Sequence, residues 1–264
     1  MFKKIVILVA LSLGFFVFNY VISEKTDYFK DTPSTLMPTP TIAPTESDLL
    51  SKTSYKIALY GDSLIDTMVD AQPSLETQLK AIYPKTLFKV YNYGIGAQNV
   101  NDGLERWDKP FSNRDREYPP IKNIKPDILI IGSFAYNPFS PHDPNKHKES
   151  LTELVKKAKQ TTARVFLLAE IAPLGDDFGT GIKGVNWTPK QSQEHSRHII
   201  EQLQNVFAVG KELNVPVIDA YTPSKAEDSE FGKRELVNVD DGIHPSPEGH
   251  DFTAKIIIST IALK

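Results

Sequence analysis

Short apolar runs alternate with longer amphipathic stretches from about residue 54 to the end of the chain. The apolar runs have the length and the branched or aromatic residues of strands, and the amphipathic stretches have the period of helices. The expected strands cover residues 56–60, 87–91, 128–132, 165–171 and 215–219. The expected helices cover residues 74–82, 100–107, 148–161, 189–213 and 247–263. Strands that alternate with helices favour a parallel sheet with helices on both faces, which narrows the fold to the α/β class.

Two of these helices begin with recognisable capping sequences. Thr188 and Pro189, followed by Gln191, match a capping box with proline at the first helical position. Ser246 and Pro247 repeat this kind of start before the last helix. Apolar residues of the long helix fall on one face, which predicts that this face is buried. They are Ile199, Leu203, Val206, Phe207 and Leu213.

The first 25 residues form a segment of their own. Lys3 and Lys4 precede an almost wholly apolar run over residues 5–22, which is long enough to cross a bilayer as a helix. No convincing cleavage site of small residues follows, which favours an uncleaved anchor over a cleaved export signal. The two lysines place the short amino-terminal side in the cytoplasm. We expect residues 1–25 to be a signal anchor with the remaining chain outside the cytoplasm, or secreted if the segment is cleaved.

Residues 26–53 are predicted to be a linker. Prolines recur among threonines and serines between residues 32 and 47, a composition that favours extended polyproline geometry over a packed core. Such a stalk would hold the following domain away from the membrane surface. Residues 54–264 then form one catalytic domain of ordinary length.

Composition excludes several classes of function. The net charge of −3, without a basic stripe, argues against a nucleic-acid partner, because phosphates need clustered cations to neutralise them. The chain has no cysteine, so disulfides, cysteine nucleophiles and thiolate metal sites are all absent.

A serine follows the first expected strand directly, in the sequence Gly61-Asp62-Ser63-Leu64. Open parallel sheets bind their ligands at the carboxyl ends of strands. The glycine eases a sharp turn, and the helix start after it offers free backbone N–H groups. The tetrapeptide alone is a weak signal, because a serine in this place is more often a helix cap or a turn residue.

A second block stands near the carboxyl terminus, where Asp241 and His244 lie three residues apart in the sequence DDGIHPS. A serine hydroxyl needs a base to become nucleophilic, and the base needs an acid that fixes its tautomer. Asp241 and His244 can supply both functions. Either residue alone is more often a turn former or a capping residue, but their joint occurrence with Ser63 favours a Ser-His-Asp triad.

With these two blocks the chain from Tyr55 onward resembles the SGNH/GDSL hydrolases. The resemblance implies a flavodoxin-like three-layer α/β/α sandwich with a central parallel sheet. It implies Ser63 as the nucleophile, with Asp241 and His244 as acid and base. It also implies a serine hydrolase that acts on ester bonds and needs no metal or organic cofactor.

Two middle blocks of the same family complete an oxyanion hole together with the N–H group of Ser63, and both are looser in this chain. After the second strand, the family position of a backbone donor falls on Ala97, with Gly96 as the alternative. Because the donor is a backbone N–H group, an alanine can serve if its dihedral angles allow. A glycine-rich turn ahead of a helix would look the same.

In the third block, strict spacing would place Phe134 where the family has its asparagine. We expect Asn137 instead, displaced by a longer turn, to offer its side-chain amide to the oxyanion. An asparagine before a proline could equally be a plain turn residue.

The loop over residues 175–187 is long and rich in glycine, and it ends in Trp187 at the sheet end that carries Ser63. We expect this loop to contact substrate, with Trp187 stacked on a sugar or covering an acyl chain. Packing of Trp187 against the sandwich is the alternative. Asp62, beside the nucleophile, is the second residue expected to bind substrate.

We expect the histidines outside the triad to lie in a solvated loop or on a helix surface and not to bind a metal. His142, Asp143 and His147 lie in a proline-rich polar stretch, where a solvated loop is favoured over a metal site. His195 and His198 lie one turn apart on the long helix, and we expect them on its surface.

The expected reaction is hydrolysis of a small-molecule or polysaccharide ester through an acyl-enzyme, for example of O-acetyl groups on an envelope carbohydrate. Three alternatives stay open. An O-acyltransferase would use the same triad with a sugar as acceptor. A lipase or lysophospholipase would need an apolar groove beside Ser63. A non-catalytic envelope-binding domain would share only the fold.

Overall fold

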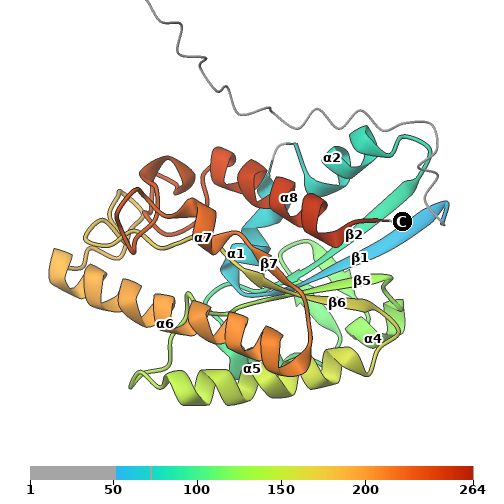
Figure 1. The fold of residues 1–264 in the computed structure, drawn as a ribbon, viewed down its shortest axis with the longest axis horizontal. Coiled ribbons are helices and arrows are strands. Elements are labelled where there is room, and N and C mark those ends of the chain that lie inside the picture. Colours follow the sequence, from blue (N-terminus) through green and yellow to red (C-terminus); the bar gives the residue numbers. More distant parts are fainter. Residues whose placement is uncertain (1–51, 72, 264) are drawn as a thin grey trace, which may run out of the picture. The chain divides into compact units, whose positions relative to one another are not determined.

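A computed structural model describes residues 52–71 and 73–263 of the chain. These residues form a five-stranded sheet whose neighbouring strands all run parallel, in the order β2-β1-β5-β6-β7 (Figure 1). The strands are β1 (Ser54–Gly61), β2 (Leu87–Gly94), β5 (Ile128–Gly132), β6 (Arg164–Ala169) and β7 (Val217–Asp219). The predicted parallel α/β sheet is confirmed, with a strand at each of the five expected places.

Helices cover both faces of the sheet, so the fold is a three-layer α/β/α sandwich (Figure 1). On one face lie α2 (Leu75–Ile82) and α8 (Pro247–Ile261). On the other face α5 (Pro144–Lys159) packs between α3 (Val100–Arg106) and α6 (Pro189–Leu213). Shorter helical segments lie in the connections: α1 (Ser63–Asp66), η1 (Thr67–Asp70), α4 (Ile121–Ile124), α7 (Tyr221–Ser224) and η2 (Arg234–Leu236).

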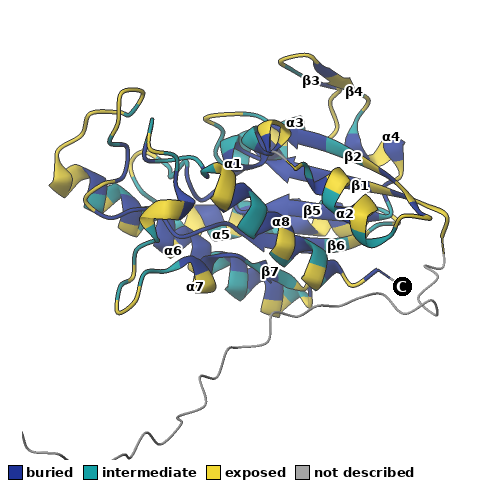
Figure 2. Cartoon of the chain, turned by 90° about the horizontal axis from the view of Figure 1, so that it is seen from above, coloured by how far each residue is buried: buried dark blue, intermediate teal, exposed yellow. Residues whose placement is uncertain are grey.

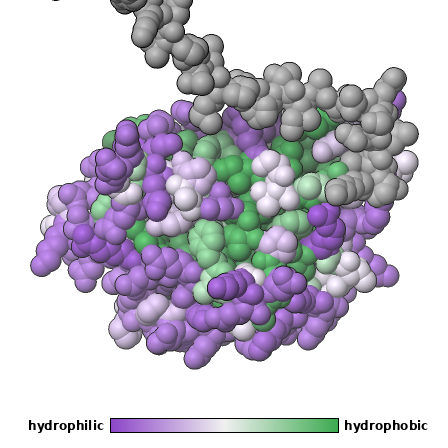
Figure 3. Space-filling model, in the orientation of Figure 1, coloured by the Kyte–Doolittle hydropathy of each residue, from purple (hydrophilic) through white to green (hydrophobic). Residues whose placement is uncertain are grey.

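The sheet itself is the core of the sandwich. Every residue of β5 is buried, and the strands lie inside a shell of helices whose outward sides are exposed (Figure 2). Hydrophilic side chains surround an apolar area over β7, between α6 and α8 (Figure 3). Burial of branched apolar residues on both faces of the strands is what stabilises a parallel sheet of this kind.

β1 lies inside the sheet, between β2 and β5, at the point where the strand order reverses. The register pairs Gly61 with Gly94 and Tyr60 with Ile131, so β1, β2 and β5 end at the same edge. In open α/β sheets, ligands bind outside the carboxyl ends of the strands at such a switch point. The topology therefore places the segment after β1, which begins with Asp62 and Ser63, at the expected ligand edge.

Several boundaries differ from the sequence-based expectation. The strand expected over residues 165–171 ends at Ala169, and the strand expected over 215–219 begins only at Val217. α5 begins at Pro144 rather than at residue 148, because the Asp143 side chain accepts a hydrogen bond from the Lys146 N–H group and caps the helix. The capping box at Thr188 and the Ser246 cap are confirmed.

A two-stranded antiparallel hairpin, β3 (Phe111–Asn113) and β4 (Arg116–Tyr118), was not predicted from the sequence. Its strands are only three residues long, too short for a period of two to be visible. The Arg116 guanidinium fixes the hairpin to the sandwich, because it forms a buried ion pair with Asp66 and donates to the backbone and side-chain oxygens of Asn92 at 2.7 Å.

The expected signal anchor and most of the expected linker lie outside the described residues. Within residues 52–71 and 73–263, no helix is both long and apolar enough to cross a membrane. The membrane segment therefore stays a prediction from the sequence.

Candidate active site

The chain turns sharply between β1 and α1. Asp62 caps α1 by accepting a hydrogen bond of 3.0 Å from the Leu64 N–H group, and Ser63 is the first residue of the helix. A Cβ atom on Gly61 would lie only 2.4 Å from the Cγ1 atom of Ile65, so the strand must end in glycine for the helix to fold back over it. This turn presents Ser63 at the carboxyl edge of the sheet.

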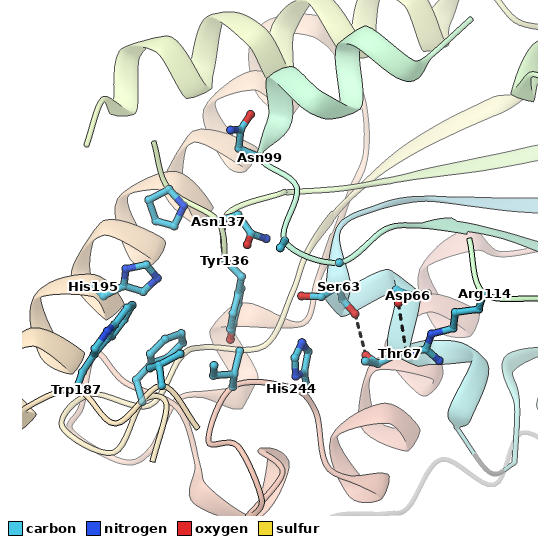
Figure 4. A pocket seen from close by; sticks show the side chains of 16 residues that line it. Ser63, Asp66, Thr67, Asn99, Arg114, Tyr136, Asn137, Trp187, His195 and His244 are labelled. Atoms are coloured by element: carbon cyan, nitrogen blue, oxygen red, sulfur yellow. Dashed lines mark hydrogen bonds and ion pairs between the residues drawn. The ribbon is translucent and has the colours of Figure 1, made fainter. Parts of the chain in front are cut away.

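Ser63 lines a cavity of about 620 Å³ (Figure 4). Segments that follow β1, β2 and β5 contribute to its lining, together with the hairpin, the 175–187 loop, α6 and the loop before α8. The lining residues are Ser63, Asp66, Thr67, Gly96, Ala97, Asn99, Arg114, Tyr136, Asn137, Pro138, Phe178, Val185, Trp187, His195, Ile243 and His244. Of the eight candidate residues for the site, six share one cavity: Ser63, Gly96, Ala97, Asn137, Trp187 and His244.

His244 faces the same space as Ser63 (Figure 4). Its Nδ1 atom donates to Asp241 Oδ2 at 2.9 Å. The other carboxylate oxygen, Oδ1, accepts from the backbone N–H groups of Ile243 at 2.8 Å and His244 at 3.0 Å. Asp241 therefore fixes the imidazole so that Nε2 is the nitrogen left free for the cavity.

The charge on Asp241 is stabilised by these contacts. Burial alone would raise the pKa of Asp241, but the hydrogen bonds from His244 and the two backbone N–H groups bring it below the usual value for an aspartate. The carboxylate is thus ionised at neutral pH and suited to stabilise a positive charge on His244.

Gly96 and Ala97 lie in the loop between β2 and α3. A Cβ atom on Gly96 would lie 3.8 Å from the Cβ atom of Ser63, so this loop passes directly beside the serine. Ala97 has a φ of 57°, in the left-handed region that alanine rarely adopts. Asn99 holds the end of the loop through a reciprocal capping box with Asp102 at the start of α3.

The turn after β5 carries Asn137 into the cavity. Phe134, at the position that strict spacing selects, is fully buried, and its ring lies against Gly103 of α3. Asn137 lies three residues further along, and its Nδ2 atom donates to Asp62 Oδ2 at 3.0 Å. The longer turn therefore brings the expected asparagine to the wall of the cavity.

Asp62, which we expected to bind substrate, lies buried behind the cavity wall. It is 1% exposed and does not line the cavity. Its carboxylate accepts from Leu64 and Asn137, and burial raises its pKa to about 6 against these hydrogen bonds. Asp62 orients the Asn137 amide instead of contacting a ligand.

Aromatic side chains form one end of the cavity. Trp187 lies with its ring centroid 4.7 Å from that of His195 and 6.2 Å from that of Phe178. The expectation that His195 lies on the helix surface is wrong: it lines the cavity, and burial lowers its pKa to about 4. Ser192 and Ser196 donate to the carbonyls of Phe178 and Leu174, which fastens the 175–187 loop over this end of α6.

The opposite end of the cavity is charged and was not predicted. Arg114, at the tip of the hairpin, pairs with Asp66 at 3.4 Å and with Asp70 at 2.9 Å (Figure 4). Thr67 donates from its hydroxyl to the Ser63 carbonyl at 3.0 Å. The polar run Asn113-Arg114-Asp115, between aromatic residues, was the available sign of a turn.

The remaining histidines do not form a metal site. In the described part of the chain, no group of three or more histidine, aspartate or glutamate side chains could hold a metal ion. His142 stacks on His198 with ring centroids 3.8 Å apart and contacts Glu201 at 2.7 Å. His147, expected in a solvated loop, is instead fully buried on α5 and donates to the Ser133 carbonyl at 2.9 Å.

A serine at the switch point of a parallel sheet, sharing a cavity with a histidine that an aspartate orients, is an arrangement typical of serine hydrolases. The sequence profile of the GDSL-like lipase/acylhydrolase family matches residues 59–252. The chain belongs to this family.

Solved structures show the same SGNH hydrolase fold. A lipase/acylhydrolase from Enterococcus faecalis is 20% identical, with a TM-score of 0.59 over 80% of this chain and 97% of that one. A GDSL-like lipase from Bacteroides thetaiotaomicron is 16% identical, with a TM-score of 0.57 over 78% and 87%. A catalytic mutant of an acetylxylan esterase from Geobacillus stearothermophilus is 18% identical, with a TM-score of 0.57 over 80% and 95%. No curated protein sequence gives a significant match.

Proposed function

We propose that Ser63, His244 and Asp241 are the catalytic triad of an extracytoplasmic esterase that removes O-acetyl groups from an envelope carbohydrate. The observation that carries this proposal is the meeting of Ser63 and an Asp241-oriented His244 in one open cavity. Ester hydrolysis follows from the family, whereas the residue roles, the substrate and the location are our proposal.

Hydrolysis proceeds in two halves. His244 Nε2 takes the proton of the Ser63 hydroxyl as its oxygen attacks the ester carbonyl, and the protonated imidazole then gives that proton to the departing sugar oxygen. The C–O bond of the ester breaks and an acetyl-Ser63 intermediate forms. Water, deprotonated by the same His244, attacks the acetyl carbonyl. The bond to Ser63 breaks, the imidazolium returns the proton to the Ser63 oxygen, and acetate leaves.

Three donors around Ser63 serve the oxyanion. The N–H group of Ser63 lies at the start of α1, the Gly96–Ala97 loop passes beside it, and the Asn137 amide lines the same cavity. Donors that are already in place stabilise the negative oxygen without reorganisation, and loss of one typically costs about 100-fold or more in kcat.

The aromatic end of the cavity supports a carbohydrate as the alcohol part of the ester. Trp187 is 37% exposed, so its ring has an open face on which a sugar can lie. Neutral His195 beside it adds a hydrogen-bonding edge without charge. The acetylxylan esterase from Geobacillus stearothermophilus, which shares this fold, is named for an acetylated polysaccharide, and this supports the same substrate class.

The location rests on the amino-terminal sequence. An apolar run behind two lysines, followed by a proline-rich stretch, supports a membrane anchor with the catalytic domain on the outer side. Protease added to intact cells, with the protein detected by a carboxyl-terminal tag, tests this. Loss of the tag supports the outer location, and protection until lysis contradicts it.

The activity is tested with p-nitrophenyl acetate, butyrate and octanoate and with a per-acetylated xylooligosaccharide, each on the wild type and on Ser63→Ala. We expect turnover that depends on Ser63, falls with acyl length, and releases acetate without an added acceptor. Turnover only when a sugar acceptor is present, with the acetyl group transferred to the sugar and no acetate released, would indicate an acyltransferase. Rates that rise toward octanoate would indicate a lipase. A folded protein without Ser63-dependent turnover on any ester contradicts the proposal.

A further inference from the structure

Ser133, directly after β5, is held at all three of its polar atoms. Its N–H group donates to both carboxyl oxygens of Glu170, at 3.0 Å and 3.3 Å. Its hydroxyl accepts from the Ala135 N–H group at 2.9 Å, and its carbonyl accepts from His147 Nε2 at 2.9 Å. Ser133 and His147 have no exposed surface and Glu170 is 3% exposed, so these hydrogen bonds do not compete with solvent.

The groups that hold Ser133 come from two different elements. Glu170 follows β6, and His147 lies on the first turn of α5. The glycine at 132 makes the first contact possible, because a Cβ atom there would lie 2.8 Å from Glu170 Oε1. Asn205 of α6 donates to the Pro144 carbonyl and lies 3.4 Å from His147 Nδ1, which supports the tautomer with its proton on Nε2.

Ser133 begins the turn that ends at Asn137. Phe134 takes a left-handed φ of 57°, and its carbonyl accepts from the Asn137 N–H group at 3.4 Å. The far end of this turn is held as well, because the Tyr136 hydroxyl donates to the Ile171 carbonyl at 2.8 Å and the Asn137 amide donates to Asp62 at 3.0 Å. Ser133 fixes the start of the same turn, so the position of the Asn137 amide depends on both ends.

We propose that Glu170 and His147 are positioning residues of the esterase, which hold the Ser133 peptide and thereby set the Asn137 amide at the distance the oxyanion requires. This inference rests on the proposed function, because it gives Asn137 the task of an oxyanion donor. Neither side chain lines the cavity, so neither touches substrate.

Both side chains are suited to this task by being uncharged at neutral pH. Burial and the nearby Asp62 raise the pKa of Glu170 to about 8, and burial lowers the pKa of His147 to about 4. An ionised Glu170 would add a second buried negative charge beneath the place where the oxyanion forms. A neutral carboxyl accepts the Ser133 N–H group without opposing that charge.

The test measures kcat and KM for p-nitrophenyl acetate on the full-length protein. Glu170→Ala removes both acceptor oxygens of the Ser133 N–H group, and His147→Leu removes the donor to its carbonyl. We expect kcat to fall about 10- to 100-fold in each variant, with KM changed less than about threefold. Glu170→Gln and His147→Gln keep an acceptor or a donor at the same place and should restore kcat to within about threefold of wild type. His142→Gln, on the same side of the fold but outside the cavity, is the matched control and should leave kcat unchanged.

A double-mutant cycle separates positioning from general damage. In an Asn137→Ala background the amide is already gone, so adding Glu170→Ala should lower kcat by less than about threefold further. Losses that simply multiply would overturn the inference, and so would an effect on KM alone. If Ser63→Ala keeps the activity, the proposed function fails instead.

A second variant serves if circular dichroism shows that Glu170→Ala does not fold. Glu170→Asp keeps the carboxyl group but moves it away from Ser133 by the length of one methylene. We then expect kcat to fall about tenfold in the wild type and to be unchanged in the Asn137→Ala background.

Discussion

Asp241 Oδ2 lies 2.9 Å from His244 Nδ1 while its other oxygen accepts two backbone N–H groups of the same loop. This arrangement holds one tautomer of the imidazole. In Asp241→Asn the backbone N–H groups retain the carbonyl oxygen, so the amide nitrogen faces Nδ1 and the proton is forced onto Nε2. We expect kcat for p-nitrophenyl acetate to fall about 100- to 10,000-fold, because Nε2 can then no longer accept the proton of Ser63. Asp240→Asn, which changes a neighbouring surface carboxylate paired with Lys183, is the matched control. Equal rates for the two variants would show that Asp241 does not orient the base.

Trp187 is predicted to contribute to the binding of carbohydrate esters and not to the binding of small esters. Trp187→Ala should raise KM for an acetylated xylooligosaccharide about tenfold and leave p-nitrophenyl acetate within about twofold, because only the sugar reaches the stacking face. Ile182→Ala, on the same loop, 89% exposed and outside the cavity lining, should change neither value. A parallel loss on both substrates would mean that the tryptophan supports the fold of the loop.

Arg116 is predicted to be a large contributor to stability. It is 8% exposed and forms the closest ion pair of the similarly buried Asp66, so Arg116→Met leaves this carboxylate with only the more distant Arg114 guanidinium and the Asn113 amide. Loss of one partner of a buried pair costs about 3–5 kcal/mol of unfolding free energy. Arg114→Met removes a more exposed cation on the same hairpin, paired with Asp70 and at 3.4 Å with Asp66, and should cost less than about 1 kcal/mol. Urea denaturation of both variants checks this, and equal midpoints would refute it.

The raised pKa of Glu170 predicts that the free energy of unfolding depends on pH. Its pKa is raised from about 4.5 in the unfolded chain to about 8 in the fold, by burial and by Asp62. Between these values the folded state keeps a proton that the unfolded state has released, so the free energy of unfolding falls as pH rises from 5 to 8. The other titratable groups near the carboxyl are Tyr136, in the turn after β5, and His250 of α8, which borders the same small void.

Glu170→Gln removes this proton uptake. We expect the variant to gain stability over the wild type as pH rises, by an amount on the order of a few kcal/mol at pH 8 and near zero at pH 5. Chemical denaturation at the two pH values measures the difference. A variant whose stability runs parallel to that of the wild type would mean that Glu170 is ionised throughout this range.

The sequence was sufficient for the sheet, because the signals of its strands are local, and the residues of the proposed triad also stand in short local blocks. Ser63 comes after a strand whose last five residues are all buried, and Asp241 and His244 lie within one short loop. Asn137 could be expected only through the family resemblance, since its place depends on the length of the turn after β5.

The rest of the site depends on contacts between distant segments. Glu170 seemed to belong to a strand, and only its burial beside Ser133 shows that it holds a turn. His195 was expected on a helix surface because the residues around it in the sequence do not predict that the 175–187 loop covers this part of α6. The serines at 192 and 196 are the one local sign, since they continue the face of Ile199 and Leu203 toward the amino end of α6.

Arg114 was missed for a related reason. Its hairpin has three-residue strands, and the contacts that hold it are made by Arg116 to residues far away in the chain. Short elements of this kind have too few residues for periodicity to show, so tertiary contacts determine them.

The proposed hydrolysis depends on the Ser63 oxygen as the nucleophile. It is tested most directly by treating the protein with a fluorophosphonate, which bonds to an activated serine and loses fluoride, and then measuring the mass of the intact chain and of its peptides. We expect one adduct per chain, located on Ser63, absent in Ser63→Ala and much slower to form in His244→Asn. An adduct on any other residue, or a folded wild-type protein that stays unlabelled, would contradict the account.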